Sequence, residues 1–149
     1  MMAAIDEVIG LDLTKALVIS ASEENRAALS EALAADGFVP ALCSSVAEAR
    51  KFIESDATEI VFCDDCLHDG TLKNAVAEVA RRHRPIPVIA VSRTGDCAEY
   101  FEALRIGAFD YLSLPLRRDE LLSVRILSQT MEAKLRPQFS RAPGVLHVL

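Results

Sequence analysis

Short apolar runs alternate with longer amphipathic segments along most of the chain. The apolar runs have the length of β-strands and cover residues 16–19, 38–43, 59–63, 86–91 and 109–112. The segments between them place apolar residues at helical spacing, which predicts helices over residues 23–35, 45–55, 72–83, 96–106 and 117–135. The predicted strands are nearly continuous hydrophobic runs, as expected for strands buried on both faces of a parallel sheet. The alternation predicts an α/β fold, a doubly wound five-stranded parallel sheet with helices on both faces.

Local signals support several of these boundaries. Gly37 follows the first predicted helix and Gly107 follows the fourth. Helices often end at a residue in the left-handed conformation, which glycine adopts at the lowest energetic cost. Ser45 and Glu48 have the spacing of a capping box at the start of the second helix. A polar turn over residues 64–70 follows the third strand.

Length, charge and hydropathy exclude several classes of protein. The 149 residues suit one domain, since domains usually have roughly 100–200 residues. We place this domain at residues 15–136. It follows an N-terminal extension, residues 1–14, and precedes a tail, residues 137–149, that is too short to fold alone. The net charge of −6 disfavours nucleic acid as a partner. No apolar run approaches the roughly 20 residues that span a membrane. The start of the chain lacks the cationic region of a secretory signal, so we expect a stand-alone cytoplasmic domain.

The residues that follow each predicted strand are the candidates for chemistry, because ligands of open parallel sheets bind beyond the carboxyl ends of the strands. They are Ser20 and Ala21, Asp64 and Asp65, Ser92 and Arg93, and Ser113, Leu114 and Pro115. None of these turns is rich in glycine. Dinucleotide-binding fingerprints and phosphate-binding P-loops are therefore excluded.

Three of these regions carry a resemblance to a known family. They are the turn 64–70 (DDCLHDG), the strand 87–92 (PVIAVS) and the run 107–115 (GAFDYLSLP). In this order they resemble the receiver domain of bacterial two-component response regulators, the family that includes the chemotaxis response regulator, over about residues 15–135. The resemblance implies a flavodoxin-like sheet of order 2-1-3-4-5. It also implies a phosphoprotein of phosphorelay signal transduction that is not an enzyme and whose partner is a histidine kinase or another signalling protein.

The resemblance also implies roles for individual residues. Asp64 matches the phosphate-accepting aspartate of the family. Ser92 and Tyr111 match the hydroxyl and aromatic residues that switch between states. Pro115 matches a proline whose preceding peptide bond is often cis.

Two departures from the family pattern weaken the expected phosphorylation. Where the family has an acidic pair that holds Mg²⁺, this chain has Ser20 and Ala21. Where the family has a lysine that neutralises the phosphoryl group, it has Leu114. Mg²⁺ prefers oxygen ligands that include carboxylates, so we expect no metal or other cofactor. We also expect phosphoryl transfer to be impaired or absent, because it depends on charge neutralisation.

Three functional hypotheses follow. The leading one is an atypical receiver domain that acts through protein–protein contacts. The second is a slow but genuine phosphoacceptor at Asp64. The third is a thiol redox sensor that uses Cys63 and Cys66, although a single pair of cysteines is a weak redox or metal signal, and inert thiols are the simpler interpretation.

Two further hypotheses concern the charge on Asp64 and the oligomeric state. Arg93 lies one strand away from Asp64 and either pairs with its carboxylate or points into solvent. The last helix carries more apolar positions than one core-facing stripe needs, among them Leu127, Met131 and Leu135. They either form a homodimer interface or are covered by residues 145–149.

Overall fold

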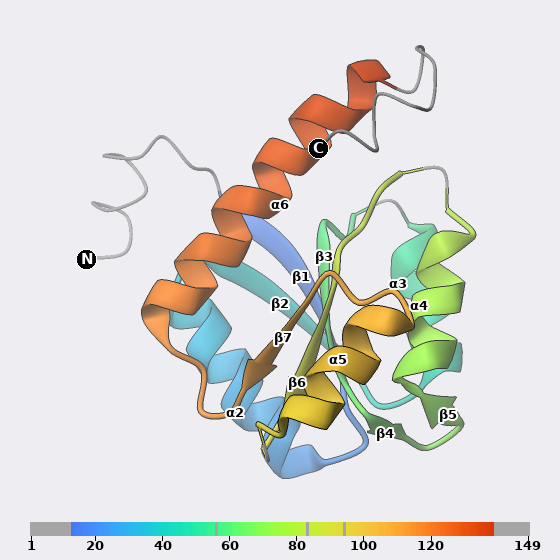
Figure 1. Ribbon diagram of the computed structural model, residues 1–149, viewed down its shortest axis with the longest axis vertical. Coiled ribbons are helices and arrows are strands. Elements are labelled where there is room, and N and C mark those ends of the chain that lie inside the picture. The colour runs from blue at the N-terminus through green and yellow to red at the C-terminus, as the bar shows by residue number, and fades with distance from the viewer. Residues whose placement is uncertain (1–12, 56, 83, 94, 139–149) are drawn as a thin grey trace.

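The computed structural model describes residues 13–55, 57–82, 84–93 and 95–138. Its main sheet has five parallel strands: β1 (Thr14–Ile19), β2 (Phe38–Cys43), β3 (Ile60–Asp64), β6 (Val88–Ser92) and β7 (Asp110–Ser113). They pair in the order β2-β1-β3-β6-β7, with their carboxyl ends at the bottom of Figure 1. Counted along these five strands alone, this is the predicted order 2-1-3-4-5, and the predicted fold class is confirmed.

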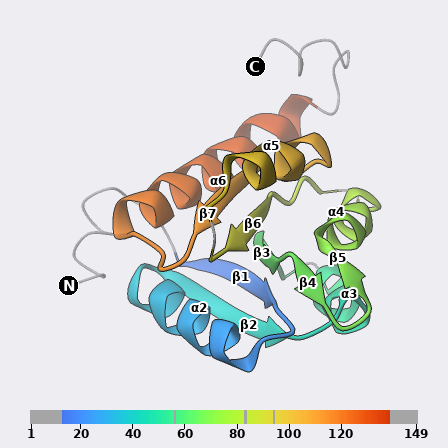
Figure 2. The same cartoon turned by 60° about the horizontal axis from the view of Figure 1, so that its bottom comes forward.

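Helices cover both faces of the sheet. Helices α2 (Glu23–Ala35) and α6 (Arg118–Gln138) lie on one face, and α3 (Val46–Glu54), α4 (Leu72–Ala80) and α5 (Cys97–Arg105) lie on the other (Figure 2). Successive residues of β1 point to opposite faces, so Leu17 packs toward the second group of helices and Val18 toward the first. This two-sided burial explains why the strands read as continuous hydrophobic runs.

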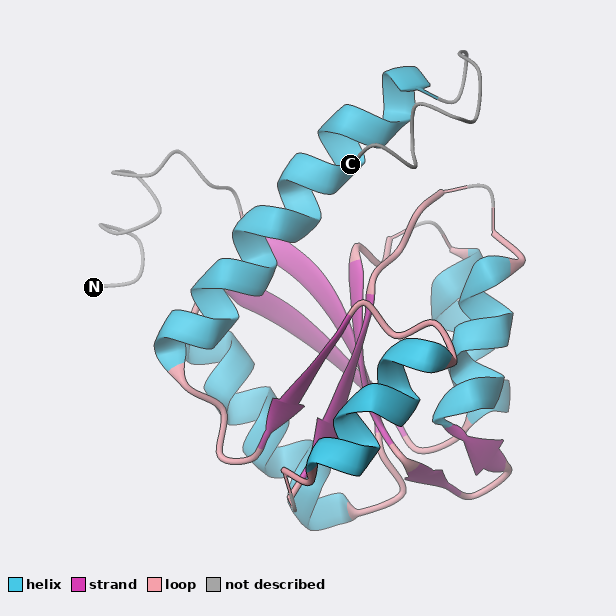
Figure 3. Ribbon diagram, viewed as in Figure 1, coloured by secondary structure: helices cyan, strands magenta, loops and turns pink. Residues whose placement is uncertain are grey.

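The element boundaries differ from the predicted ones in a few places. The turn after β3 contains a short antiparallel ribbon, β4 (Cys66–Leu67) with β5 (Gly70–Thr71) (Figure 3). Helix α4 ends three residues earlier than predicted, because the Arg81 N–H turns back to the Glu78 carbonyl, and α6 extends three residues further. Residues 1–12 of the predicted N-terminal extension and residues 139–149 of the predicted tail lie outside the described residues. Thr14, which the prediction placed in the extension, is the first residue of β1.

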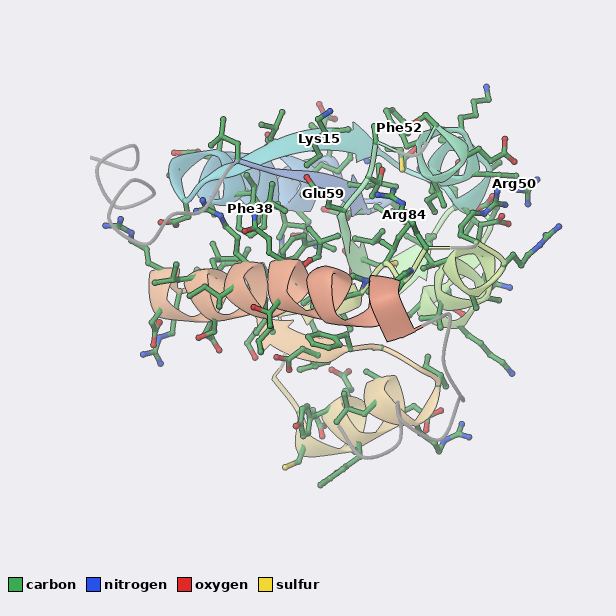
Figure 4. All side chains as sticks on the ribbon, turned by 90° about the horizontal axis from the view of Figure 1, so that it is seen from above. Lys15, Phe38, Arg50, Phe52, Glu59 and Arg84 are labelled. Atoms are coloured by element: carbon green, nitrogen blue, oxygen red, sulfur yellow. The ribbon has the colours of Figure 1, made fainter. Side chains whose placement is uncertain are left out.

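Polar contacts at the amino ends of the strands tie the layers together. Arg118 of α6 donates to Asp36 at 2.8 Å, and Gln129 donates to Thr14 at 2.9 Å. On the side viewed in Figure 4, the Lys15 N–H donates to Glu59 Oε2 at 2.8 Å. The opposite, carboxyl edge of the sheet holds the candidate residues. No helix in the described part of the chain has the length and apolar character that crossing a membrane requires.

Candidate functional site

Asp64 and Ser20 lie side by side where two neighbouring strands end. Ile19 pairs with Cys63 in the register of β1 and β3, so the residues that follow them are adjacent. The hydroxyl of Ser20 donates to Asp64 Oδ2 at 2.9 Å, and its oxygen accepts the Ser22 N–H at 3.1 Å. Ser20 is fully buried, whereas Asp64 is half-buried. Ser20 therefore contacts Asp64 directly, through a neutral donor.

Asn25 is the second side chain on this carboxylate, and sequence analysis missed it. It lies in the first turn of α2, where its Nδ2 donates to Asp64 Oδ2 at 2.9 Å. Its Oδ1 accepts from Nε and Nη2 of Arg93, at 2.9 and 2.5 Å. A signal was present in the sequence, since Asn25, Leu29 and Leu33 are spaced four residues apart and form the buried stripe of α2. A polar residue on such a stripe needs buried partners.

The predicted direct ion pair between Asp64 and Arg93 is wrong, because the amide of Asn25 lies between the two side chains. Among the residues that the structure describes, Arg93 forms its ion pair with Glu24, at 3.5 Å. The side chains of Arg93 and Glu24 are 56% and 82% exposed, so this pair is weak. Arg93 therefore reaches Asp64 only through Asn25.

Among the described residues, the hydrogen bonds to the Asp64 carboxylate come from neutral donors. Besides the two bonds on Oδ2, the Asp65 N–H donates to Oδ1 at 2.8 Å. Ala21, at the second position of the expected acidic pair, offers no polar side-chain atom. The described residues include no cluster of three or more His, Cys, Asp and Glu side chains that could hold a metal ion.

Leu114 stands where the resemblance leads us to expect a lysine. It is half-buried and packs against the apolar cluster on the α2 and α6 face, so it adds no charge to the edge of the sheet. The Leu114–Pro115 peptide bond is cis, as the resemblance implied.

The side chains of Ser92 and Tyr111 both form hydrogen bonds with a third residue, Glu99 of α5. The hydroxyl of Ser92 donates to Glu99 Oε2 at 3.1 Å, and the hydroxyl of Tyr111 donates to the same oxygen at 2.8 Å. The two predicted switch residues are thus brought together through a carboxylate that sequence analysis did not single out.

Asp69, the second acidic residue of the turn after β3, caps a helix. The N–H groups of Val46 and Ala47 donate to its two carboxylate oxygens at 2.8 and 3.0 Å. These bonds hold the pKa of Asp69 below its usual value. Asp69 therefore anchors the turn that follows Asp64 to the start of α3.

The described cysteines of the core have the properties of unreactive thiols. Cys63 is fully buried, and burial raises the pKa of its thiol. Burial, followed by the nearby Glu48, raises the pKa of the Cys43 thiol to about 12. The Cys66 side chain lies outside the described set. A protonated, buried thiol is a poor nucleophile, so the geometry disfavours a redox function for Cys63.

Comparisons with known proteins agree on one family. A family model described as the response regulator receiver domain matches residues 16–125. The response regulator protein PilR of Pseudomonas aeruginosa is 27% identical over 133 residues, which cover 87% of this chain and 30% of PilR. The transcriptional regulatory protein DpiA of Escherichia coli is 32% identical over 80 residues, which cover 54% of this chain and 35% of DpiA. The chain thus spans about a third of the length of these two curated relatives.

Solved structures have the same fold. A response regulator receiver domain protein from Clostridium thermocellum superposes with a TM-score of 0.72 at 22% identity, covering 83% of this chain and 99% of that one. The beryllofluoride-activated NtrC4 receiver domain dimer gives a TM-score of 0.65 at 22% identity, covering 76% of this chain and 94% of that one. Likeness at this level of identity supports the fold alone.

Proposed function

Because the chain belongs to the response regulator receiver domain family, we propose that it is an atypical member, one that signals through protein–protein contacts without Mg²⁺-dependent phosphorylation. Receiver domains are signalling modules of two-component systems, and we assign this chain no catalytic activity of its own. Its partner in this proposal is a histidine kinase or another signalling protein.

The observation that carries the proposal is the pair of neutral donors on Asp64 Oδ2. Ser20 and Asn25 both donate to this oxygen at 2.9 Å, and Ser20 stands at a position where the family has a carboxylate that holds Mg²⁺. Mg²⁺ is bound through oxygen ligands in nearly octahedral geometry, usually with carboxylates among them. Here Asp64 is the one carboxylate of the expected set. The residues present therefore do not fit the ion, and we derive no step that uses it.

The second support is that, within the described part of the chain, no cationic side chain is bonded directly to the Asp64 carboxylate. Phosphoryl transfer depends on positioning and on neutralising charge on the transferred group. Leu114 offers no charge, and the cation of Arg93 is separated from Asp64 by the Asn25 amide. A phosphoryl group on Asp64 would thus meet hydrogen-bond donors but little positive charge.

Intact mass after incubation with acetyl phosphate and Mg²⁺ tests the proposal. We expect no added phosphoryl group on the natural chain, and a measurable fraction of phosphorylated chain for the variant Ser20→Asp, Ala21→Asp, Leu114→Lys. The same triple variant carrying Asp64→Asn is the control for the site of attachment. If the natural chain is phosphorylated as fully as the triple variant, the proposal fails and the alternative of a genuine phosphoacceptor at Asp64 holds.

We also propose that the chain forms a homodimer through α6. Ile126 and Leu127 are 39% and 49% exposed, and the C-terminal part of α6 extends past the end of the sheet (Figure 1). Exposed apolar side chains of this kind are typical of interfaces. The side chains of Met131 and Leu135, which the hypothesis also named, lie outside the described set.

A further inference from the structure

Helix α5 is weakly packed against the rest of the domain. Of its nine residues, Ala103 is the one that is buried, whereas Phe101 is 66% exposed. A cavity of about 240 Å³ lies beside the helix, and its walls include Leu72 of α4, Ala90 of β6 and Tyr111 of β7. Apolar burial therefore contributes little to the position of α5, and its polar contacts gain in importance.

Glu99 provides two of these contacts through a single oxygen atom. Its Oε2 accepts the hydroxyl of Ser92 at 3.1 Å and the hydroxyl of Tyr111 at 2.8 Å. Ser92 ends β6, next to the strand that ends in Asp64, and Tyr111 belongs to the edge strand β7. Both bonds are exposed to solvent, but the ionised acceptor makes them stronger than bonds between neutral groups in the same setting. One carboxylate thus joins α5 to two strands.

The contact also reaches the exposed aromatic side chains of α5. The ring of Tyr111 packs edge-on against Tyr100 with centroids 6.0 Å apart, and Tyr100 packs against Phe101 at 5.4 Å. A displacement of Tyr111 would therefore disturb the outer face of α5.

We infer that Glu99 is a positioning residue that holds α5 to the sheet and couples Ser92, beside the Asp64 site, to Tyr111. Because both hydroxyls share one acceptor oxygen, a displacement of the Glu99 carboxylate alters its contacts with Ser92 and with Tyr111 together. The coupling does not require phosphorylation of Asp64, so it goes beyond the proposed function and can fail or hold independently of it.

Hydrogen exchange of the α5 amides tests the attachment of the helix. Glu99→Ala removes both contacts, and we expect exchange in α5 to quicken about tenfold, with little change in β1 and β3. Glu102→Ala is the matched control, because Glu102 also lines the cavity but bonds Arg105 of the same helix, at 2.6 and 2.9 Å. Equal effects of the two substitutions would overturn the inference, since a general loss of helix stability would then explain both.

Amide chemical shifts in NMR test the coupling itself. Tyr111→Phe removes one hydroxyl, and we expect it to shift the Ser92 amide signal in the natural chain but at most weakly in the Glu99→Ala background. A shift of the same size in both backgrounds would show that Tyr111 affects Ser92 without Glu99. Glu99→Gln keeps one acceptor oxygen and should lie between the natural chain and Glu99→Ala in both experiments.

Discussion

The substitution Asn25→Ala tests whether the amide of Asn25 holds the carboxylate of Asp64 in place. Asn25 is 9% exposed, and its bond to Asp64 is the more protected of its contacts. A hydrogen bond to a charged group contributes about 1.5–3 kcal/mol to the free energy of unfolding. The contact with Arg93 adds only about 0.5 kcal/mol, because the arginine side chain is 56% exposed.

Alanine recovers part of this loss, because it favours an α-helix over asparagine by about 0.6 kcal/mol. The expected net destabilisation is therefore about 2 kcal/mol. For a domain of this size, each 1 kcal/mol lowers the melting temperature by roughly 4 °C, so we expect a fall of about 8 °C.

Urea unfolding followed by circular dichroism measures the change in free energy. Arg93→Ala is the matched control, since it removes the outer contact of Asn25 and leaves the inner one, and we expect a loss below about 0.5 kcal/mol. If Asn25→Ala costs no more than Arg93→Ala, then Asn25 does not support Asp64, and the account of the site is wrong. The double variant should show a coupling between the two positions no larger than the loss caused by Arg93→Ala, at most about 0.5 kcal/mol.

Three other predictions address stability and assembly. Burial raises the pKa of Glu78, but hydrogen bonds from Arg50 and Arg82 outweigh this effect and hold the pKa below the ordinary value of 4.5. The natural chain should therefore be more stable than Glu78→Gln above this pH, and the difference in the free energy of unfolding should shrink as pH falls below it. Urea unfolding at several pH values measures this difference. Gly37 has a φ of 90°, and a Cβ there would clash with the buried Arg125 guanidinium. Gly37→Ala should therefore lower the free energy of unfolding by at least about 2 kcal/mol in thermal unfolding, and a loss below about 0.5 kcal/mol would contradict this reasoning. Sedimentation should show a dimer for the natural chain and a monomer for Leu127→Glu, and a monomer in both cases would exclude the α6 interface.

The periodicity of the sequence was enough to predict the layers of this domain. Continuous apolar runs such as residues 59–63 can be buried only between two layers of helices, and this property is local. The same local pattern placed Asp64 and Ser92 at strand ends, and the resemblance of the motifs around them supplied their roles and the strand order. The short ribbon of β4 and β5 was missed, because strands of two residues leave no periodic signal.

The partners at the carboxyl edge were decided by the tertiary structure alone. Asn25 meets Asp64 across 39 positions of the chain and Arg93 across 68, and Glu99 meets Tyr111 across 12. The side chains that surround a carboxylate at this edge depend on how α2 and α5 pack on the sheet. Helical periodicity predicts which face of a helix points inward, but it does not predict which residues that face contacts. For this reason the sequence by itself could place Arg93 near Asp64, while the fold put the amide of Asn25 between them.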